Sequence, residues 1–263
     1  MKYINRIIIA SMLLSVTALV GCQPKKDAQD SVVSSADAKD LFVVSKTVPV
    51  TLVHQRVCDE TECTDFEVQT VETNHDWINA YFMDRFKKTI PMAFDEKAKS
   101  TAKENVEPQN LSEISMVVRY VGQNAHLATF QLSHSSYNAG AAHGMYHNEY
   151  VNFDLKQKKR IAVEDLIESN KEKELTETLY DTNSMWLDDH SVNKADFKLS
   201  DNFYFGAQGL VFVYPLYDLA SYAEGESELL LPYHWTSNLI KPQYLPNLPK
   251  YPKLEEYKEE QKK

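Results

Sequence analysis

Hydrophobic and polar positions follow two periods between residues 41 and 241. Short segments rich in Val, Ile, Phe and Tyr, some of them apolar at every second residue, are typical of half-buried strands. These segments are 42–44, 48–53, 66–71, a hairpin over 111–137 that turns at 122–124, 150–155, strands within 197–217 around a turn at 206–209, and 229–233. Apolar residues three and four positions apart instead predict amphipathic helices. These helices are 77–86 with Asn74 as N-cap and Pro91 beyond its end, 94–106, 171–186 and 235–240.

This order of elements predicts an α+β fold, with a mixed or antiparallel sheet and helices packed mainly on one side. The central unit is Ser135–Ile167, in which a strand breaks at Asn138–Gly140 and again at His143–Gly144. The strand then resumes, and a basic turn leads into a short helix at Glu164. We expect Gly144 to adopt a backbone conformation that other residues avoid, since glycine permits angles that a Cβ forbids.

The first 22 residues have the pattern of an export signal. Lys2 and Arg6 are followed by an apolar stretch, 7–20, that is short for a membrane span. The stretch ends in Leu19-Val20-Gly21-Cys22, which is similar to the bacterial lipobox. We therefore expect Cys22 to carry lipid and to anchor the protein in a membrane. The alternatives are an ordinary signal peptide and an N-terminal membrane anchor.

Composition divides the rest of the chain. Residues 23–40 are predicted to be a disordered tether, because they contain almost nothing to bury. A folded region follows, with an N-terminal lobe over 41–135 and a C-terminal lobe over 136–241. Residues 242–263 are rich in proline and then charged, which predicts a solvated tail or a segment that binds a partner. Gln23 rather than Asp follows Cys22, which favours the outer membrane, facing the periplasm.

The chain is acidic, with 38 Asp and Glu against 28 Lys and Arg and a formal net charge of −10. Removal of Lys2 and Arg6 with the signal takes two positive charges away and leaves −12. This charge disfavours nucleic acid as a partner and favours cationic partners.

Two cysteines, Cys58 and Cys63, lie between expected strands and bracket a four-residue turn. Outside the cytoplasm such thiols usually pair, so we predict a disulfide that closes a hairpin. A redox pair or a metal site is the alternative. The spacing is not that of the common Cys-x-x-Cys motif, and no adjacent basic residue would activate a thiol.

The sequence contains no nucleophile elbow, phosphate-binding loop, dinucleotide fingerprint or zinc-protease motif. His134, His143 and His147 are the nearest approach to a metal cluster. Imidazoles four positions apart would share a helix face, but Gly140 and Gly144 argue against a helix here. We expect the His143 ring to bond local backbone or to contact a partner. Ser133 and Ser135 flank His134 without an assignable third partner for nucleophilic catalysis. The acidic pairs at 164–165 and 188–189 are typical of helix caps and surfaces. We therefore expect no catalytic residue, no metal and no cofactor.

Two separated blocks resemble one extracytoplasmic domain family. The first block is Gly140-Ala141-Ala142-His143-Gly144, then residues 150–155 and 159–166; the second is residues 209–225 and 231–233. This domain is shared by RsiV-type lysozyme-sensing anti-sigma factors and PdaC-type polysaccharide deacetylases. The resemblance runs from about Leu41 to Ile240 and is weak before Leu111. The N-terminal lobe is similar to the PdaC-type domain, and the C-terminal lobe is similar to the RsiV-type domain.

The resemblance implies two classes of ligand, a lysozyme and peptidoglycan. We expect an envelope lipoprotein whose non-catalytic domain binds a lysozyme or another cationic envelope protein. The expected contact loop lies between Ser135 and His147 and presents Tyr137, Asn138, His143 and Tyr146. The alternative is an accessory factor that binds cell-wall glycan, or a peptidoglycan-modifying enzyme.

Overall fold

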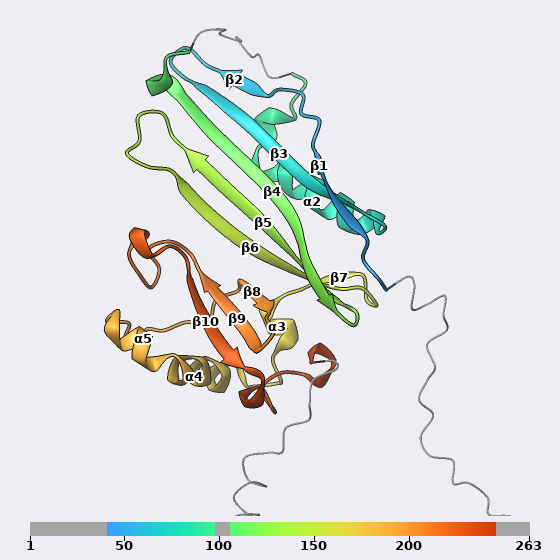
Figure 1. Cartoon of the computed structure of the whole chain (residues 1–263), viewed down its shortest axis with the longest axis vertical. Helices are drawn as coiled ribbons and strands as arrows, with labels where there is room; N and C mark the ends of the chain where they lie inside the picture. Colours follow the sequence, from blue (N-terminus) through green and yellow to red (C-terminus); the bar gives the residue numbers. More distant parts are fainter. Residues whose placement is uncertain (1–40, 98–105, 246–263) are drawn as a thin grey trace, which may run out of the picture.

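The computed structural model describes residues 41–97 and 106–245. A large sheet of seven strands is formed by residues between Ser45 and Ile161 (Figure 1). Its strands are β1 (Ser45–Pro49), β2 (Arg56–Cys58), β3 (Cys63–Thr73), β4 (Leu111–Asn124), β5 (Leu127–Tyr137), β6 (Met145–Asp154) and β7 (Lys159–Ile161). The order is β1-β3-β4-β5-β6-β7, with β2 also paired to β3. Only β3 and β4 run parallel among these pairs, so the sheet is mixed, as predicted.

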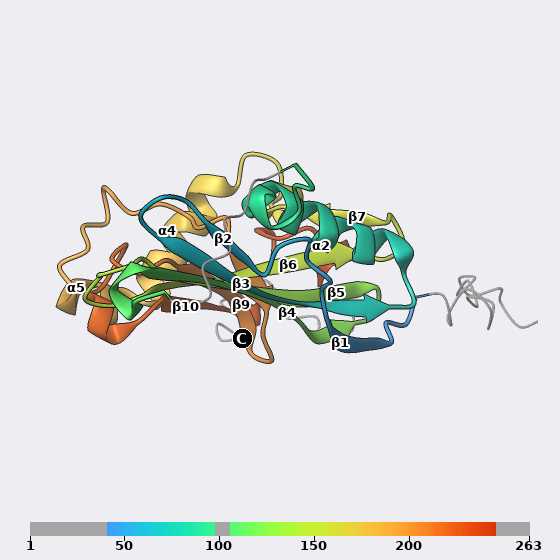
Figure 2. The same cartoon turned by 90° about the horizontal axis from the view of Figure 1, so that it is seen from above.

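Helix α2 (Asp76–Thr89) covers one face of the large sheet (Figure 2). Its residues Ile78, Phe82 and Phe86 are fully buried, and their spacing of four places them on one stripe of the helix. Phe82 packs against Phe130 of β5 and Phe153 of β6, with ring centroids 5.4 and 6.0 Å apart. This aromatic cluster fixes the helix on the sheet.

Three further strands form a second antiparallel sheet in the order β10-β9-β8. They are β8 (Phe203–Phe205), β9 (Gly209–Tyr214) and β10 (Ser227–Pro232). Helix α4 (Glu172–Thr182) packs on this sheet through Leu175 and Leu179, and α5 (Ser184–Asp189) follows it. The short helix α3 (Val163–Leu166) links the two sheets. The remaining short 3₁₀ helices are η1 (Pro91–Ala93), η2 (Pro108–Asn110), η3 (Tyr222–Glu224), η4 (Tyr233–Trp235) and η5 (Pro242–Tyr244). The predicted α+β class, with helices on one side of the sheets, is confirmed.

Several predicted element ends are wrong for local reasons. The residue that caps α2 is His75 and not Asn74, because the Asn74 amide instead bonds the chain before β1, at Val44 N and Phe42 O. The β4–β5 hairpin turns at Ala125 and His126 rather than at 122–124. Ala125 takes the positive φ of 51° that the turn needs, and Gly122 lies beside a bulge.

Three predicted helices also differ from the structure. The helix expected over 171–186 divides at Asn183, whose side-chain amide donates to the carbonyls of Leu179 and Leu230. Residues 94–97 contain no helix, and 98–105 lie outside the described residues. Residues 236–240 form turns that end in a bridge between Ile240 and Ile167 instead of a helix.

The hydrophobic core has two parts. One lies between α2 and the large sheet, and the other lies between the small sheet and the segments 161–187 and 239–244. The boundary expected at residues 135 and 136 falls inside β5, and Tyr244, in the segment expected to be a tail, is buried. The signal with Cys22, the tether 23–40 and residues 246–263 lie outside the described residues. Within residues 41–97 and 106–245, no helix is both long enough and apolar enough to cross a membrane.

Candidate functional site

The tip of the β5–β6 hairpin holds the four residues that the sequence singled out. Tyr137 ends β5, and its hydroxyl donates to the carbonyl of Ala141 across the turn, at 2.9 Å. The Asn138 carbonyl accepts the amide of the same Ala141, also at 2.9 Å. His143 and Tyr146 are exposed on the other arm of the hairpin. The tip is therefore an ordered turn that presents aromatic and polar groups.

A segment far away in the sequence packs against this tip. The ring of Tyr222, in η3, lies 4.2 Å from the ring of His143, and its hydroxyl donates to the Gly144 carbonyl at 2.8 Å. Gly225 has a φ of 82°, and a Cβ there would lie 2.8 Å from the Tyr146 hydroxyl. We call Tyr137, Asn138, His143, Tyr146 and Tyr222 the hairpin-tip surface. Because two chain segments brace it, this surface is preformed.

Gly144 is required here for a reason other than the one the sequence predicted. Its φ is not in the left-handed region, where only Gly140 and Gly225 lie among the described glycines. A Cβ on Gly144 would instead lie 2.9 Å from the backbone carbonyl oxygen of Ser136. The constraint is the close approach of two hairpin arms and not an unusual backbone angle.

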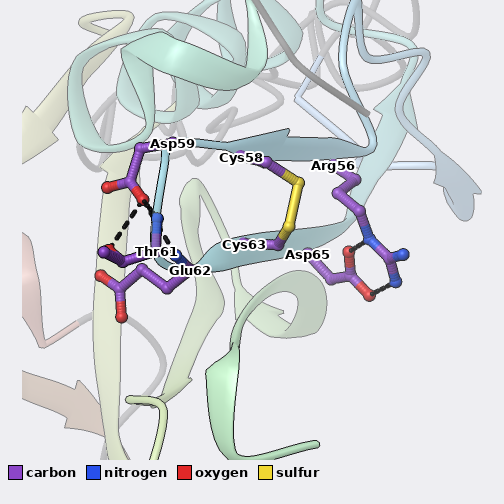
Figure 3. Close-up of a disulfide and its surroundings, with 7 residues drawn as sticks. All are labelled: Arg56, Cys58, Asp59, Thr61, Glu62, Cys63 and Asp65. Atoms are coloured by element: carbon purple, nitrogen blue, oxygen red, sulfur yellow. Dashed lines mark hydrogen bonds and ion pairs between the residues drawn. A yellow bond between two sulfur atoms is a disulfide. The ribbon is translucent and has the colours of Figure 1, made fainter. Parts of the chain in front are cut away.

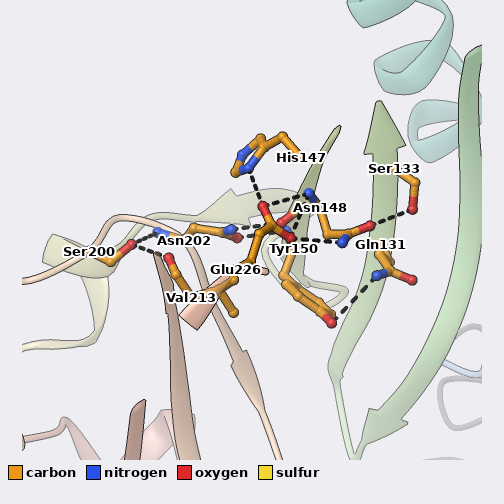
Figure 4. Close-up of polar contacts among 9 residues, drawn as sticks. All are labelled: Gln131, Ser133, His147, Asn148, Tyr150, Ser200, Asn202, Val213 and Glu226. Carbon is orange, nitrogen blue, oxygen red and sulfur yellow. Dashed lines mark hydrogen bonds and ion pairs between the residues drawn. The ribbon is translucent and has the colours of Figure 1, made fainter. Parts of the chain in front are cut away.

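Glu226 joins the small sheet to β6 immediately beside this surface (Figure 4). One carboxylate oxygen lies 2.7 Å from His147 Nδ1, and the other accepts the Asn148 side-chain amide at 2.7 Å. The backbone amide of Asn148 also points at the carboxylate. The side chain of Glu226 is only 7% exposed, so these bonds compensate a buried charge.

The electrostatics of this pair favour the ionised forms. The hydrogen bond that His147 donates to Glu226 raises the pKa of His147 above its ordinary value, against the effect of burial. Burial alone would raise the pKa of Glu226, but the hydrogen bonds from His147 and Asn148 outweigh it and lower that pKa. Each member of the pair therefore favours the ionised form of the other, and together they form a latch between the sheets.

Asn202, just before β8, continues the same junction. Its amide donates to the Asn148 carbonyl and its oxygen accepts the Tyr150 amide, both at 2.7 Å. Further along β6, the Asn152 side chain donates to the Phe203 carbonyl at 2.7 Å. Backbone groups on the edge of β6 that β7 does not reach are therefore bonded by side chains of the second sheet (Figure 4).

The three histidines considered as a metal cluster do not lie together. His134 and His147 face each other across β5 and β6, but His143 stacks on Tyr222 instead. Burial lowers the pKa of His134, and its Nε2 has no hydrogen-bond partner. Within 41–97 and 106–245, no group of three or more His, Cys, Asp or Glu side chains is placed to hold a metal.

The order of polar groups around Glu224 does not match a hydrolytic triad. The Ser221 hydroxyl donates to one carboxylate oxygen at 2.8 Å, and His190 Nε2 lies 2.6 Å from the other. In a triad the imidazole lies between the nucleophile and the acid and takes the proton of the nucleophile. Here the carboxylate lies between them and accepts from both groups, so the Ser221 hydroxyl contacts Glu224 and not the His190 imidazole.

Cys58 and Cys63 form a disulfide at one end of the large sheet (Figure 3). They pair directly across β2 and β3, with their Cα atoms 4.0 Å apart. The Asp59 carboxylate accepts the backbone amides of Thr61 and Glu62 within the closed turn. The disulfide is structural. It lies at the same end of the large sheet as the hairpin tip, with β4 between β3 and β5.

The fold is of the α+β class, and one family model matches its C-terminal part. Residues 153–234 match the family model described as "Protein of unknown function (DUF3298)", so the chain contains a DUF3298 domain. This domain covers the end of β6 through η4 and includes Tyr222, Asn202 and Glu226.

Two solved structures share the fold. A DUF3298 family protein from Pseudomonas aeruginosa PAO1 is 17% identical, with a TM-score of 0.57, covering 77% of this chain and 96% of that chain. A DUF3298 family member from Bacteroides fragilis NCTC 9343 is 18% identical, with a TM-score of 0.51, covering 75% of this chain and 94% of that chain. A search of curated proteins finds no match. The narrower resemblance to RsiV-type and PdaC-type domains remains a prediction.

Tyr222, Asn202 and Glu226 carry much of the site but had no predicted role. Tyr222 lies in the second block of the family resemblance, which was the available signal for it. Asn202 and Glu226 lie in polar loop sequences that resemble ordinary turns. Their partners are 54 and 79 residues away in the chain, and no local pattern indicates such contacts.

Proposed function

We propose that this chain is an envelope lipoprotein whose folded domain binds a basic protein of the lysozyme type through the hairpin-tip surface. The observation that carries this proposal is the bracing of His143 and Tyr146 by Tyr222 and Gly225. A preformed aromatic surface loses little conformational entropy when it binds, and Tyr is enriched at such contacts.

Charge supports a cationic partner. Without its signal the chain has a formal net charge of −12, whereas lysozymes of the common animal type are small and basic. Glu224 lies in η3 beside Tyr222, with its side chain 47% exposed. Opposite charges accelerate encounter, but the specific contact has to come from the aromatic groups.

The proposed anchor is lipid on Cys22, with the domain held at the outer membrane and facing the periplasm. The domain is proposed to act by binding and not by catalysis. In support, the Ser221, Glu224 and His190 arrangement has the wrong order for a nucleophile. No cofactor is required by this role.

Calorimetry of the exported protein against hen-type lysozyme tests the proposal. Binding is expected to persist at about 0.15 M salt, where exposed charges more than about 8 Å apart are largely screened. The double change Tyr137→Ala and His143→Ala, and separately Tyr222→Phe, should weaken binding. Tyr222→Phe removes only the hydroxyl that holds Gly144.

Trp235→Ala is the matched control. Trp235 is an exposed aromatic residue, 41% accessible, beyond the end of β10 that lies away from Gly225. It should leave binding unchanged. Absence of heat at this salt concentration, or equal binding by an unrelated protein of similar basicity, would refute the proposal and favour a glycan ligand.

A further inference from the structure

A cleft of about 780 Å³ lies next to the hairpin-tip surface but is lined by other residues. Its two walls are the loop that follows α5, within 190–200, and the segment that follows β9, within 214–221. Small-molecule sites typically have volumes of about 300 to 1,000 Å³. The cleft is therefore large enough for a ligand of several ring units, and the proposed protein-binding surface does not use it.

Both walls contain a residue with unusual backbone geometry. Tyr217 has a φ of 70°, and Ser191 on the opposite wall has a φ of 59°. Left-handed conformations are uncommon for bulky residues, and they concentrate at ligand-binding sites when the surroundings hold them in place. This conformation leaves Tyr217 56% exposed, with its ring stacked on Tyr222 at 5.7 Å.

The floor of the cleft is rigid and aromatic. Tyr214 and Phe197 are buried, with ring centroids 5.7 Å apart. The Tyr214 hydroxyl donates to the Lys198 carbonyl at 2.9 Å and so ties the two walls together. Burial raises the pKa of Tyr214, so its hydroxyl stays protonated and keeps this bond. The cleft is thus present before any ligand arrives.

The charged groups of the cleft have both signs. Asp196 and Lys198 lie on one wall and Asp218 lies on the other, and all three are exposed. In the part of the chain that the structure describes, none of these three side chains has an ion-pair partner. A purely cationic ligand would meet Lys198, and a purely anionic ligand would meet the two carboxylates. The donor Lys198 and the acceptors Asp196 and Asp218 lie in the same cleft as the exposed Tyr217 ring, and this combination suits a ligand with many hydroxyl groups.

We infer that this cleft binds a short neutral oligosaccharide. The Tyr217 ring provides a face for the apolar side of a sugar ring. Asp196 and Asp218 accept hydrogen bonds from sugar hydroxyls, and Lys198 donates to ring or hydroxyl oxygens. Tyr217 also touches Tyr222 of the hairpin-tip surface, so the saccharide site and the proposed protein site adjoin each other.

The inference is tested by titrating the full exported protein with chitotriose, cellotriose and maltotriose, using calorimetry and ligand-observed NMR. At least one of these trisaccharides is expected to bind. Tyr217→Gly should weaken that binding by at least about tenfold, which corresponds to about 1.4 kcal/mol. Because glycine suits a positive φ, this variant should melt at the same temperature as the wild type or higher.

Asp196→Asn and Asp218→Asn remove charge with little change of shape, and each should weaken the same binding. Trp235→Ala is the control, since Trp235 is exposed but does not line the cleft. Failure of all three sugars to bind overturns the inference, and so does binding that Tyr217→Gly leaves unchanged. Lysozyme binding measured on the Asp196→Asn variant reports separately on the hairpin-tip surface, because Asp196 is not part of it.

Discussion

At the scale of single residues, Glu226 and Gly144 differ in how much of their role the sequence reveals. Glu226 lies within the polar run 224–228, and nothing local distinguishes it from Glu224 or Glu228. Its role comes from His147 and Asn148, which the fold brings to the same place. Gly144 could be recognised as a special position from the sequence. The reason for it, the Ser136 carbonyl, required the paired hairpin.

The latch of His147 and Glu226 predicts a dependence of stability on pH. The folded pKa of His147 lies above 6.5, so its stabilisation is complete below about pH 6.5 and is lost as pH rises through the raised value. The folded pKa of Glu226 lies below 4.5, so its stabilisation is lost as pH falls through that lowered value. The difference in melting temperature between wild type and His147→Gln should therefore be largest between about pH 4.5 and 6.5.

This difference should shrink on going to pH 9. Taking a difference removes the contribution of His190, whose pKa is raised by its hydrogen bond to Glu224. The contribution of His134 changes with the variant, because burial and then the neighbouring His147 lower its pKa. A constant difference from pH 5 to 9 would show that the latch carries no charge-dependent stabilisation.

Gly144→Val should lower the free energy of unfolding by more than about 1 kcal/mol. The added Cβ would lie 2.9 Å from the Ser136 carbonyl oxygen, and this backbone atom cannot move without disturbing β5. Gly122→Val is the matched control, because a Cβ at Gly122 meets nothing within 4 Å. Chemical denaturation of both variants checks the prediction, which fails if they lose equal stability.

At the scale of elements, the sequence predicted what local periodicity determines. The aromatic stripe of α2, the paired strands around the central hairpin and the cysteine-closed turn are all present. The predictions missed helix ends and helix breaks where a side chain bonds a distant part of the chain instead of its own helix. Asn74 bonds the chain before β1 instead of capping α2, and Asn183 bonds β10 instead of continuing a helix. The parallel pairing of β3 and β4 depends on the crossover through α2 and could not be read from either strand.

The disulfide should stabilise the β2–β3 end of the large sheet. Replacing both Cys58 and Cys63 with Ser is expected to lower the free energy of unfolding by about 2 kcal/mol, because the small loop is no longer closed. Intact-mass measurement of alkylated protein, with and without reductant, establishes the bond. Two thiols that alkylate freely in unreduced, exported protein would contradict it. The Arg56 and Asp65 pair beside the bond should be retained in the variant, since its geometry comes from the strand register.

At the scale of the whole molecule, two cores joined by polar contacts make one body. The sequence predicted the class of fold and the position of the hairpin tip. It could not predict that residues 222–226 complete the tip, because those contacts span about 80 positions of the chain. The mixed charges of the cleft were likewise invisible, since its walls come from separate loops.

Cys22→Ser should release the protein from the membrane fraction, because serine cannot form the thioether to a lipid. Fractionation of cells that express wild type and variant, followed by immunodetection, measures this. The double change Cys58→Ser and Cys63→Ser serves as the control, because it replaces the other two cysteines without leaving an unpaired thiol and keeps the proposed anchor intact. A Cys22→Ser protein that is still processed and still needs detergent for extraction would contradict lipidation.

The bonds from Asn202 and Glu226 to β6 also determine how copies of this protein meet one another. An open strand edge is a template on which a second chain can add, and molecules held on a membrane surface encounter each other often. Here the backbone amides of Asn148 and Tyr150 on this edge already donate to the Glu226 and Asn202 side chains of the same molecule. On the opposite edge of the sheet, β1 is short and contains Lys46 and Pro49, which also discourage pairing with another chain. The fold therefore resists edge-to-edge polymerisation even when many copies crowd one surface.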